Sequence, residues 1–104
     1  MNELSPLEAN ALLENDVLLV DVREVDELAV IAYDVKNLLN VPLSEFEQRF
    51  TEIPKDQKVI FACRAGVRSA RAIQFLAHNG YDAALLINLD GGMNAWEAYG
   101  LRTK

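Results

Sequence analysis

The only cysteine of the chain, Cys63, is followed by residues that suit a reactive thiolate. Arg64 and Arg68 come one and five positions after it, and Gly66 lies between them. Positive charge close to a thiol favours its ionised form, and the thiolate is the nucleophilic form. A lone cysteine after an apolar strand is otherwise most often a buried and inert residue. The glycine and the two arginines favour the reactive interpretation.

The same segment has the features of an anion-binding site. Gly66 lets the backbone turn so that its N–H groups point inward, and Ser69 is predicted to cap the following helix. The first N–H groups of a helix lack partners within it, and the helix dipole adds partial positive charge there. Residues 57–104 hold 6 basic and 3 acidic residues, against 4 and 13 in 1–56. We therefore expect the segment to activate the sulfur and to attract an anion to it.

Apolar runs and helix signals predict the elements that position Cys63. Residues 58–62 are a short, largely apolar run, typical of a strand buried on both faces. Residues 69–80 have the pattern of a helix that ends at Gly80. Cys63 is thus expected between a strand and a helix. The remaining predicted strands are 17–22, 38–43 and 83–89, and the remaining predicted helices lie within 5–15, 23–33, 44–50 and 91–100.

The order of these elements predicts the fold. Capping boxes at Ser5 with Glu8 and at Ser44 with Glu47 are expected to start two of the helices. Strands that alternate with helices through short loops form a parallel sheet with helices on both faces. The sequence therefore predicts a three-layer α/β/α fold with a mainly parallel central sheet flanked by helices. Ligands bind at the carboxyl ends of the strands in such sheets, where Cys63 is expected.

Length and composition limit the other possibilities. The 104 residues, of which 51% are hydrophobic, suit a single domain over 1–104. One cysteine and one histidine cannot make an internal disulfide or a zinc site, and no other cofactor is predicted. The net charge of −6 argues against nucleic-acid and anionic-membrane binding. No apolar run is long enough for a membrane helix.

The cytoplasm is the expected location. The first 15 residues hold three glutamates and no basic residue, which is unlike a signal peptide. A single thiol without a disulfide partner also suits a reducing compartment.

Four motifs resemble one family. The motif "CRAGVRS", residues 63–69, resembles the active-site loop of rhodanese-type sulfurtransferases, in which a cysteine is followed by five residues that surround its sulfur. "LLVDVRE" (18–24) resembles the family's first-strand signature, "LLNVPL" (38–43) its next strand, and "NLDGGMNAWEAYGL" (88–101) its closing segment. These motifs occur in the family's order and span about residues 13–102. The chain thus resembles a single-domain rhodanese of the thiosulfate sulfurtransferase family.

The resemblance implies that Cys63 is the catalytic nucleophile and carries the transferred sulfur as a persulfide. It implies thiosulfate or a persulfide as the donor and a thiol or cyanide as the acceptor, with a sulfur-relay protein as a further partner. The backbone amides of the loop would hold the persulfide, and Arg68, more than Arg64, would bind the donor's sulfonate. The residues implied in substrate binding are Arg64, Ala65, Gly66, Val67, Arg68 and Ser69.

One segment departs from the family pattern. Tyr33, Asp34 and Val35 stand where many members have Gly-His-Ile. This leaves the local conformation of residues 30–38 open, and Asp34 would disfavour an anionic donor if it lay at the mouth of the site. Asp21 and Arg23 are expected to form a structural ion pair or a hydrogen-bond network that fixes the loops, rather than to act in catalysis.

Two other functions stay open. Cysteine phosphatases have a related fold and a cysteine–arginine loop with five intervening residues. Four residues separate Cys63 from Arg68, so the loop suits one sulfur atom better than a phosphate, and an arsenate reductase is disfavoured with the phosphatase. Some rhodanese-like domains are non-catalytic binding or regulatory modules. The intact Cys63 argues against that role without excluding it.

Overall fold

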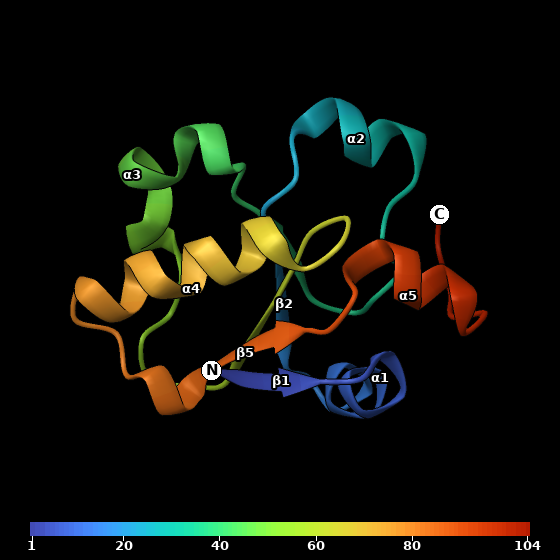
Figure 1. Cartoon of the computed structure of the whole chain (residues 1–104), viewed down its shortest axis with the longest axis horizontal. Helices are drawn as coiled ribbons and strands as arrows, with labels where there is room; N and C mark the ends of the chain where they lie inside the picture. Colours follow the sequence, from blue (N-terminus) through green and yellow to red (C-terminus); the bar gives the residue numbers. More distant parts are fainter.

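The computed structural model describes residues 1–104, and its centre is a five-stranded sheet (Figure 1). The strands have the order β1-β5-β4-β2-β3, and every neighbouring pair is parallel. The central strand is therefore β4, the strand that Cys63 follows. The strands are β1 (Asn2–Leu4), β2 (Leu18–Asp21), β3 (Leu38–Asn40), β4 (Val59–Ala62) and β5 (Leu86–Leu89).

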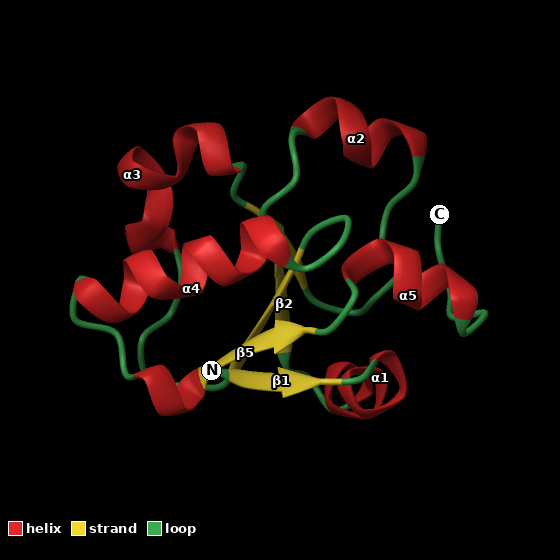
Figure 2. Ribbon diagram, viewed as in Figure 1, coloured by secondary structure: helices red, strands yellow, loops and turns green.

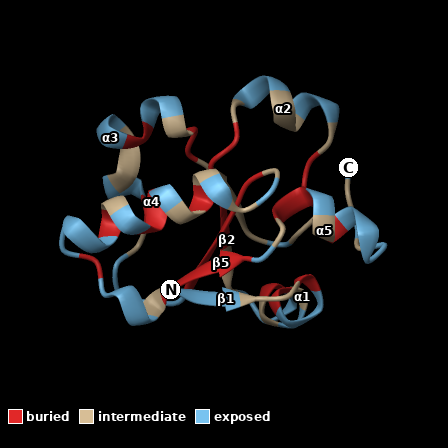
Figure 3. Cartoon of the chain, in the orientation of Figure 1, coloured by how far each residue is buried: buried red, intermediate tan, exposed pale blue.

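Helices cover both faces of the sheet (Figure 2). One core cluster joins the sheet to α3 and α4, and a second joins it to α1 and α5. The short helix α2 has no buried residue and lies apart from both layers (Figure 3). The helices are α1 (Pro6–Glu14), α2 (Val25–Val30), α3 (Phe46–Arg49), α4 (Val67–His78) and α5 (Gly92–Ala98), with 3₁₀ turns at Leu43–Glu45, Phe50–Glu52 and Ala83–Leu85.

The central strand shows why these runs are almost continuously apolar. All four residues of β4 are fully buried. Successive side chains of a strand point to opposite faces, and here Val59 and Phe61 enter the cluster below α3 and α4, whereas Ile60 and Ala62 enter the cluster below α1 and α5. Because both faces are covered, neither set of side chains meets water. This burial fixes the position from which the Cys63 loop departs.

The structure confirms the predicted three-layer fold and corrects some element boundaries. The capping box of Ser5 and Glu8 starts α1 as expected. The capping box predicted at Ser44 is wrong, because the Ser44 hydroxyl donates a hydrogen bond to Glu24 instead. Strand β1 was not predicted, and the first residues of the predicted strand 83–89 form a 3₁₀ turn.

None of the helices has the length and apolar character that crossing a membrane would require.

Candidate active site

The Cys63 sulfur lies inside the loop that joins β4 to α4, with only 1% of the residue exposed. The Gly66 N–H donates a hydrogen bond to Sγ over 3.0 Å. The Ser69 Oγ lies 3.4 Å from Sγ. The predicted position of Cys63, directly after the central strand, is therefore confirmed, and its sulfur is surrounded by the residues that follow it.

Helix α4 begins earlier than predicted. Its first residue is Val67 and its N-cap is Gly66, whose φ of 99° lies in the left-handed region that glycine adopts at low cost. The predicted N-cap role of Ser69 is therefore wrong. Ser69 instead lies in the first helical turn, fully buried, where its hydroxyl faces the sulfur.

The hydrogen bonds to the loop hold its carbonyl groups away from the sulfur. The Met93 N–H donates to the Cys63 carbonyl (2.9 Å), and the Asn94 N–H donates to the Arg64 carbonyl (3.0 Å). The Tyr33 hydroxyl donates to the same Cys63 carbonyl over 2.7 Å. Because the Cys63 and Arg64 carbonyl oxygens are directed to these partners, the peptide units of the loop can turn N–H groups, such as that of Gly66, toward the sulfur.

Gly92, at the start of α5, permits this contact. A Cβ at position 92 would lie 2.5 Å from the Cys63 carbonyl oxygen and 2.7 Å from the Arg64 carbonyl carbon. Those distances are far below van der Waals contact, so any side chain here would displace the loop. Figure 1 shows the loop between β4 and α4 running close to the start of α5.

The buried side chains of Ser69 and Asn88 form a short hydrogen-bonded chain that supports the loop. The Ser69 hydroxyl donates to Asn88 Oδ1 over 2.6 Å, and Asn88 Nδ2 donates to the Gly66 carbonyl over 3.1 Å. A hydroxyl has a single proton. When Cys63 is a thiol, Ser69 can donate to Asn88 and accept from the S–H group; when Cys63 is a thiolate, the Ser69 proton can turn to the sulfur.

These contacts set the ionisation of Cys63. Burial raises the pKa of the thiol, but hydrogen bonds to the thiolate from the Ser69 hydroxyl and from the amides of Ser69, Gly66 and Ala65 lower it more. The net result is a pKa below the usual value of a cysteine. The site therefore favours the nucleophilic form of the sulfur.

The two loop arginines both have acidic partners. Arg68 makes two hydrogen bonds to the Glu27 carboxylate of α2, at 2.7 and 2.9 Å. This contact lowers the pKa of Glu27 to about 2. Arg64 lies 3.7 Å from Glu97 of α5, a looser and more exposed pair. The predicted role of these arginines as donor-binding cations stays a prediction, and Glu27 was not foreseen.

Asp21 and Arg23 form the structural ion pair that was expected. The pair is fully buried, with 2.9 Å between Arg23 Nη2 and Asp21 Oδ2. Arg23 also donates to the Ile31 carbonyl, and its guanidinium lies 5.3 Å from the ring centroid of Tyr33. The pair therefore braces Tyr33, whose hydroxyl holds the Cys63 carbonyl.

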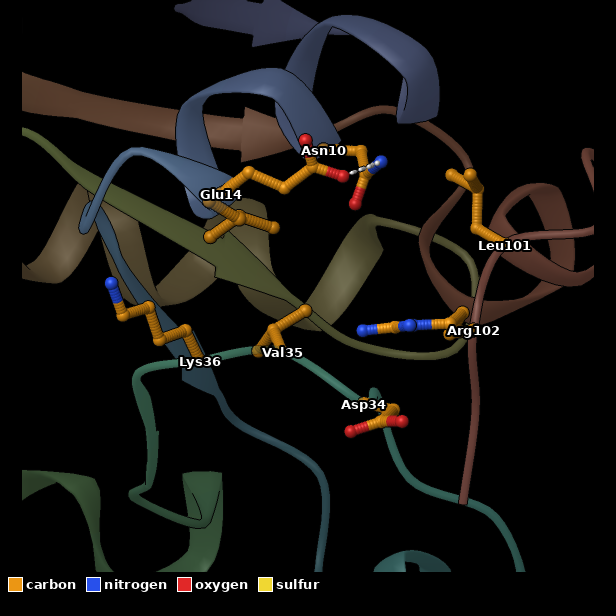
Figure 4. Close-up of a pocket in the computed structure, with 8 residues that line it drawn as sticks. Asn10, Glu14, Asp34, Val35, Lys36, Leu101 and Arg102 are labelled. Atoms are coloured by element: carbon orange, nitrogen blue, oxygen red, sulfur yellow. Dashed lines mark hydrogen bonds between the residues drawn. The ribbon is translucent and has the colours of Figure 1, made fainter.

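The segment that departs from the family pattern contributes to the site in an unexpected way. Tyr33 is fully buried against Trp96, with 5.4 Å between the ring centroids. Asp34 does not touch the loop; it lines a separate hollow of about 550 Å³ between α1 and the end of the chain (Figure 4).

The sequence did not predict that Tyr33, Asn88 and Gly92 support the loop. Of the three, only Tyr33 could have been noticed, because it stands where the family pattern has another residue.

Comparison with known proteins agrees with this geometry. A model of the rhodanese-like domain matches residues 5–99. A protein named sulfurtransferase from Allochromatium vinosum is 42% identical over 86 residues, which are 83% of this chain and 77% of that protein. The putative sulfurtransferase YtwF of Bacillus subtilis is 29% identical over 81% of this chain and 77% of its own length.

Solved structures extend the agreement to the whole fold. The polysulfide-sulfur transferase of Wolinella succinogenes superposes with a TM-score of 0.84 at 31% identity, covering 100% of this chain and 78% of that one. A rhodanese-related protein of Thermoplasma volcanium superposes with a TM-score of 0.82 at 26% identity, covering 100% and 98%. The relatives support sulfur transfer as the general activity, and the chain belongs to the rhodanese family.

Proposed function

We propose that this chain moves a sulfane sulfur from thiosulfate or a persulfide donor to a thiophilic acceptor, such as a thiol or cyanide, through a persulfide on Cys63. The observation that carries the proposal is the hydrogen bond from the Gly66 N–H to the Cys63 sulfur, within a loop whose Cys63 and Arg64 carbonyls accept hydrogen bonds from α5. The names of the sulfurtransferase relatives support the same chemistry.

The first step loads the sulfur. The Cys63 thiolate attacks the outer sulfur of thiosulfate, a new S–S bond forms, and the S–S bond of the donor breaks with both electrons leaving on sulfite. Cys–S⁻ and S₂O₃²⁻ thus become Cys–S–S⁻ and SO₃²⁻. The persulfide anion needs hydrogen-bond donors, and the amides of Ala65, Gly66 and Ser69, which favour the thiolate, suit it as well.

The second step unloads the sulfur. Cyanide attacks the terminal sulfur, the Cys63 thiolate leaves, and thiocyanate forms, so that Cys–S–S⁻ and CN⁻ become Cys–S⁻ and SCN⁻. Two-step covalent catalysis of this kind gives ping-pong kinetics. The chain has no second cysteine to take the sulfur, so the acceptor is a separate molecule, which includes a thiol of a sulfur-relay protein. The proposed chemistry requires no metal or organic cofactor.

Intact-protein mass spectrometry tests the proposal. After incubation with thiosulfate or an organic persulfide, the chain should gain the mass of one sulfur atom, and cyanide should remove it. The Cys63→Ser variant should stay folded and gain nothing, because a hydroxyl is not ionised at neutral pH. If the wild type gains no sulfur from either donor, the protein is a binding or regulatory module of the family instead.

A further inference from the structure

The carboxylate of Glu27 binds Arg68, the loop arginine that the family resemblance implies in binding an anionic donor. Glu27 comes from α2, 41 residues before Arg68 in the sequence, and binds the guanidinium through both carboxylate oxygens. About 28% of the Glu27 side chain and 31% of the Arg68 side chain are exposed, so water screens the pair only in part. Glu27 also accepts a hydrogen bond from the Glu24 N–H, which holds its carboxylate in place.

The other charges close to Glu27 and Arg68 in the chain are mixed in sign. Arg64, the other arginine of the loop, has Glu97 beside it. Asp26, next to Glu27 on α2, and Arg71, three residues after Arg68 on α4, are both exposed and carry opposite charges. Each of the two loop arginines is thus matched by one carboxylate.

Charge beside the loop affects sulfur donors unequally. Thiosulfate arrives with two negative charges, and the sulfite that leaves also carries two. An organic hydrodisulfide, R–S–SH, transfers its outer sulfur when the Cys63 thiolate attacks it: Cys–S⁻ and R–S–SH become Cys–S–SH and R–S⁻, and the single thiolate then takes a proton from water. The thiolate that leaves carries one negative charge, whereas sulfite carries two, so the carboxylates beside the loop repel it less.

We propose that Glu27 is a specificity-determining residue that, by pairing with Arg68, disfavours sulfonate donors such as thiosulfate and directs the site toward organic hydrodisulfides. The inference rests on the proposed sulfur transfer and adds the class of donor. Glu27 does not touch the sulfur; it acts through Arg68, whose charge it neutralises. Exposed Val67, at the start of α4, adds an apolar side chain to the loop that suits an organic donor better than an inorganic anion.

The test compares two charge-neutral substitutions with two donors. In Glu27→Gln, the amide oxygen can still accept from Glu24, but the negative charge beside Arg68 is gone. Glu52→Gln is the matched control, because Glu52 also binds an arginine, Arg49, through both oxygens at 2.9 and 3.1 Å, and has no contact with the loop. The donors are thiosulfate and the hydrodisulfide of 2-mercaptoethanol, each with cyanide as the acceptor.

Glu27→Gln should raise kcat/KM for thiosulfate roughly three- to tenfold, mainly through KM, and should change kcat/KM for the hydrodisulfide less than about twofold. Glu52→Gln should change neither. Wild-type turnover of thiosulfate should also not fall as ionic strength rises, because both arginines of the loop are paired with carboxylates. This second measurement needs no variant to fold.

Three results would overturn the inference while leaving sulfur transfer intact. They are an unchanged kcat/KM for thiosulfate in Glu27→Gln, an equal rise for both donors, and a wild-type thiosulfate turnover that falls with salt. Failure of the wild type to gain sulfur from either donor would instead overturn the proposed function itself.

Discussion

At the scale of single residues, the position of the Cys63 carbonyl depends on side chains far away in the sequence. Tyr33 lies 30 residues before Cys63, and its hydroxyl still reaches that carbonyl. Burial raises the pKa of Tyr33, so its hydroxyl stays protonated and remains a donor. A buried tyrosine that holds the backbone of the nucleophile should affect chemistry as well as stability.

Replacing Tyr33 with Phe should therefore have two effects. The loss of one buried hydrogen bond should lower the free energy of unfolding by about 1 kcal/mol, and the rate of sulfur loading should fall because the loop is less well fixed. Tyr81→Phe is the control, since the Tyr81 hydroxyl donates to the Ile53 carbonyl over 2.6 Å, away from the loop. Urea denaturation and single-turnover loading measure the two quantities. Equal loss of loading in both variants would contradict the special role of Tyr33.

Ser69 should control the ionisation of the sulfur. Without its hydroxyl, the Cys63 thiolate loses a hydrogen-bond donor, so Ser69→Ala should raise the pKa of Cys63. The reaction needs the thiolate, so activity falls as the pH drops below this pKa, and in the variant that fall should begin at a higher pH. Thiolate absorbance against pH measures the effect directly, with Ser44→Ala as a control remote from the sulfur. An unshifted midpoint would show that the backbone amides alone set the pKa.

At the scale of elements, the start of α5 is the support against which the Cys63 loop rests. Gly92→Ala puts a Cβ 2.5 Å from the Cys63 carbonyl oxygen, whereas the matched change Gly100→Ala meets nothing within 4 Å. Both glycines have positive φ, so both variants bear the backbone cost of about 1 kcal/mol. Gly92→Ala should lose a further ~1–3 kcal/mol of unfolding free energy and most of its sulfur loading. Urea denaturation and loading assays on both variants would show a common loss if only backbone strain mattered.

The elements also show how far sequence reasoning reaches. Strands β2 and β4 were predicted because burial on both faces leaves an apolar run, and Cys63 was placed correctly because its position depends only on the adjacent strand. Strand β1 was missed because its residues, Asn-Glu-Leu, form no apolar run and pair only with β5 at the edge of the sheet. Glu27, Asn88 and Gly92 were missed because they reach the loop through tertiary contacts, which a local pattern does not contain.

At the scale of the whole molecule, the pair of Glu27 and Arg68 ties the outlying helix α2 to α4. The pKa of Glu27 is about 2 in the folded protein, below the ~4.3 of a free glutamate. A lowered pKa stabilises the fold above the unfolded value, and this contribution is lost as the pH falls toward the folded value. The contribution should thus be complete above about pH 4.5 and should vanish near pH 2.

Urea denaturation of wild type and Glu27→Gln across this range measures that contribution. The wild type should be the more stable protein at neutral pH, and the difference between the two should shrink steadily below about pH 4.5. Glu52→Gln serves again as the comparison, because its partner Arg49 does not connect α2 to the body of the molecule. A difference that stays constant with pH would mean that the Glu27 charge does not support the fold.

The grip of α5 on the Cys63 loop has a consequence for the newly made chain. The Cys63 and Arg64 carbonyls receive their hydrogen bonds from Met93 and Asn94, which the ribosome adds about thirty residues later. Until then the loop lacks the contacts that turn its amides toward the sulfur. We therefore expect the emerging polypeptide to carry an ordinary, weakly reactive thiol. Cys63 should become a strong nucleophile only when α5 has been made and packed against the loop.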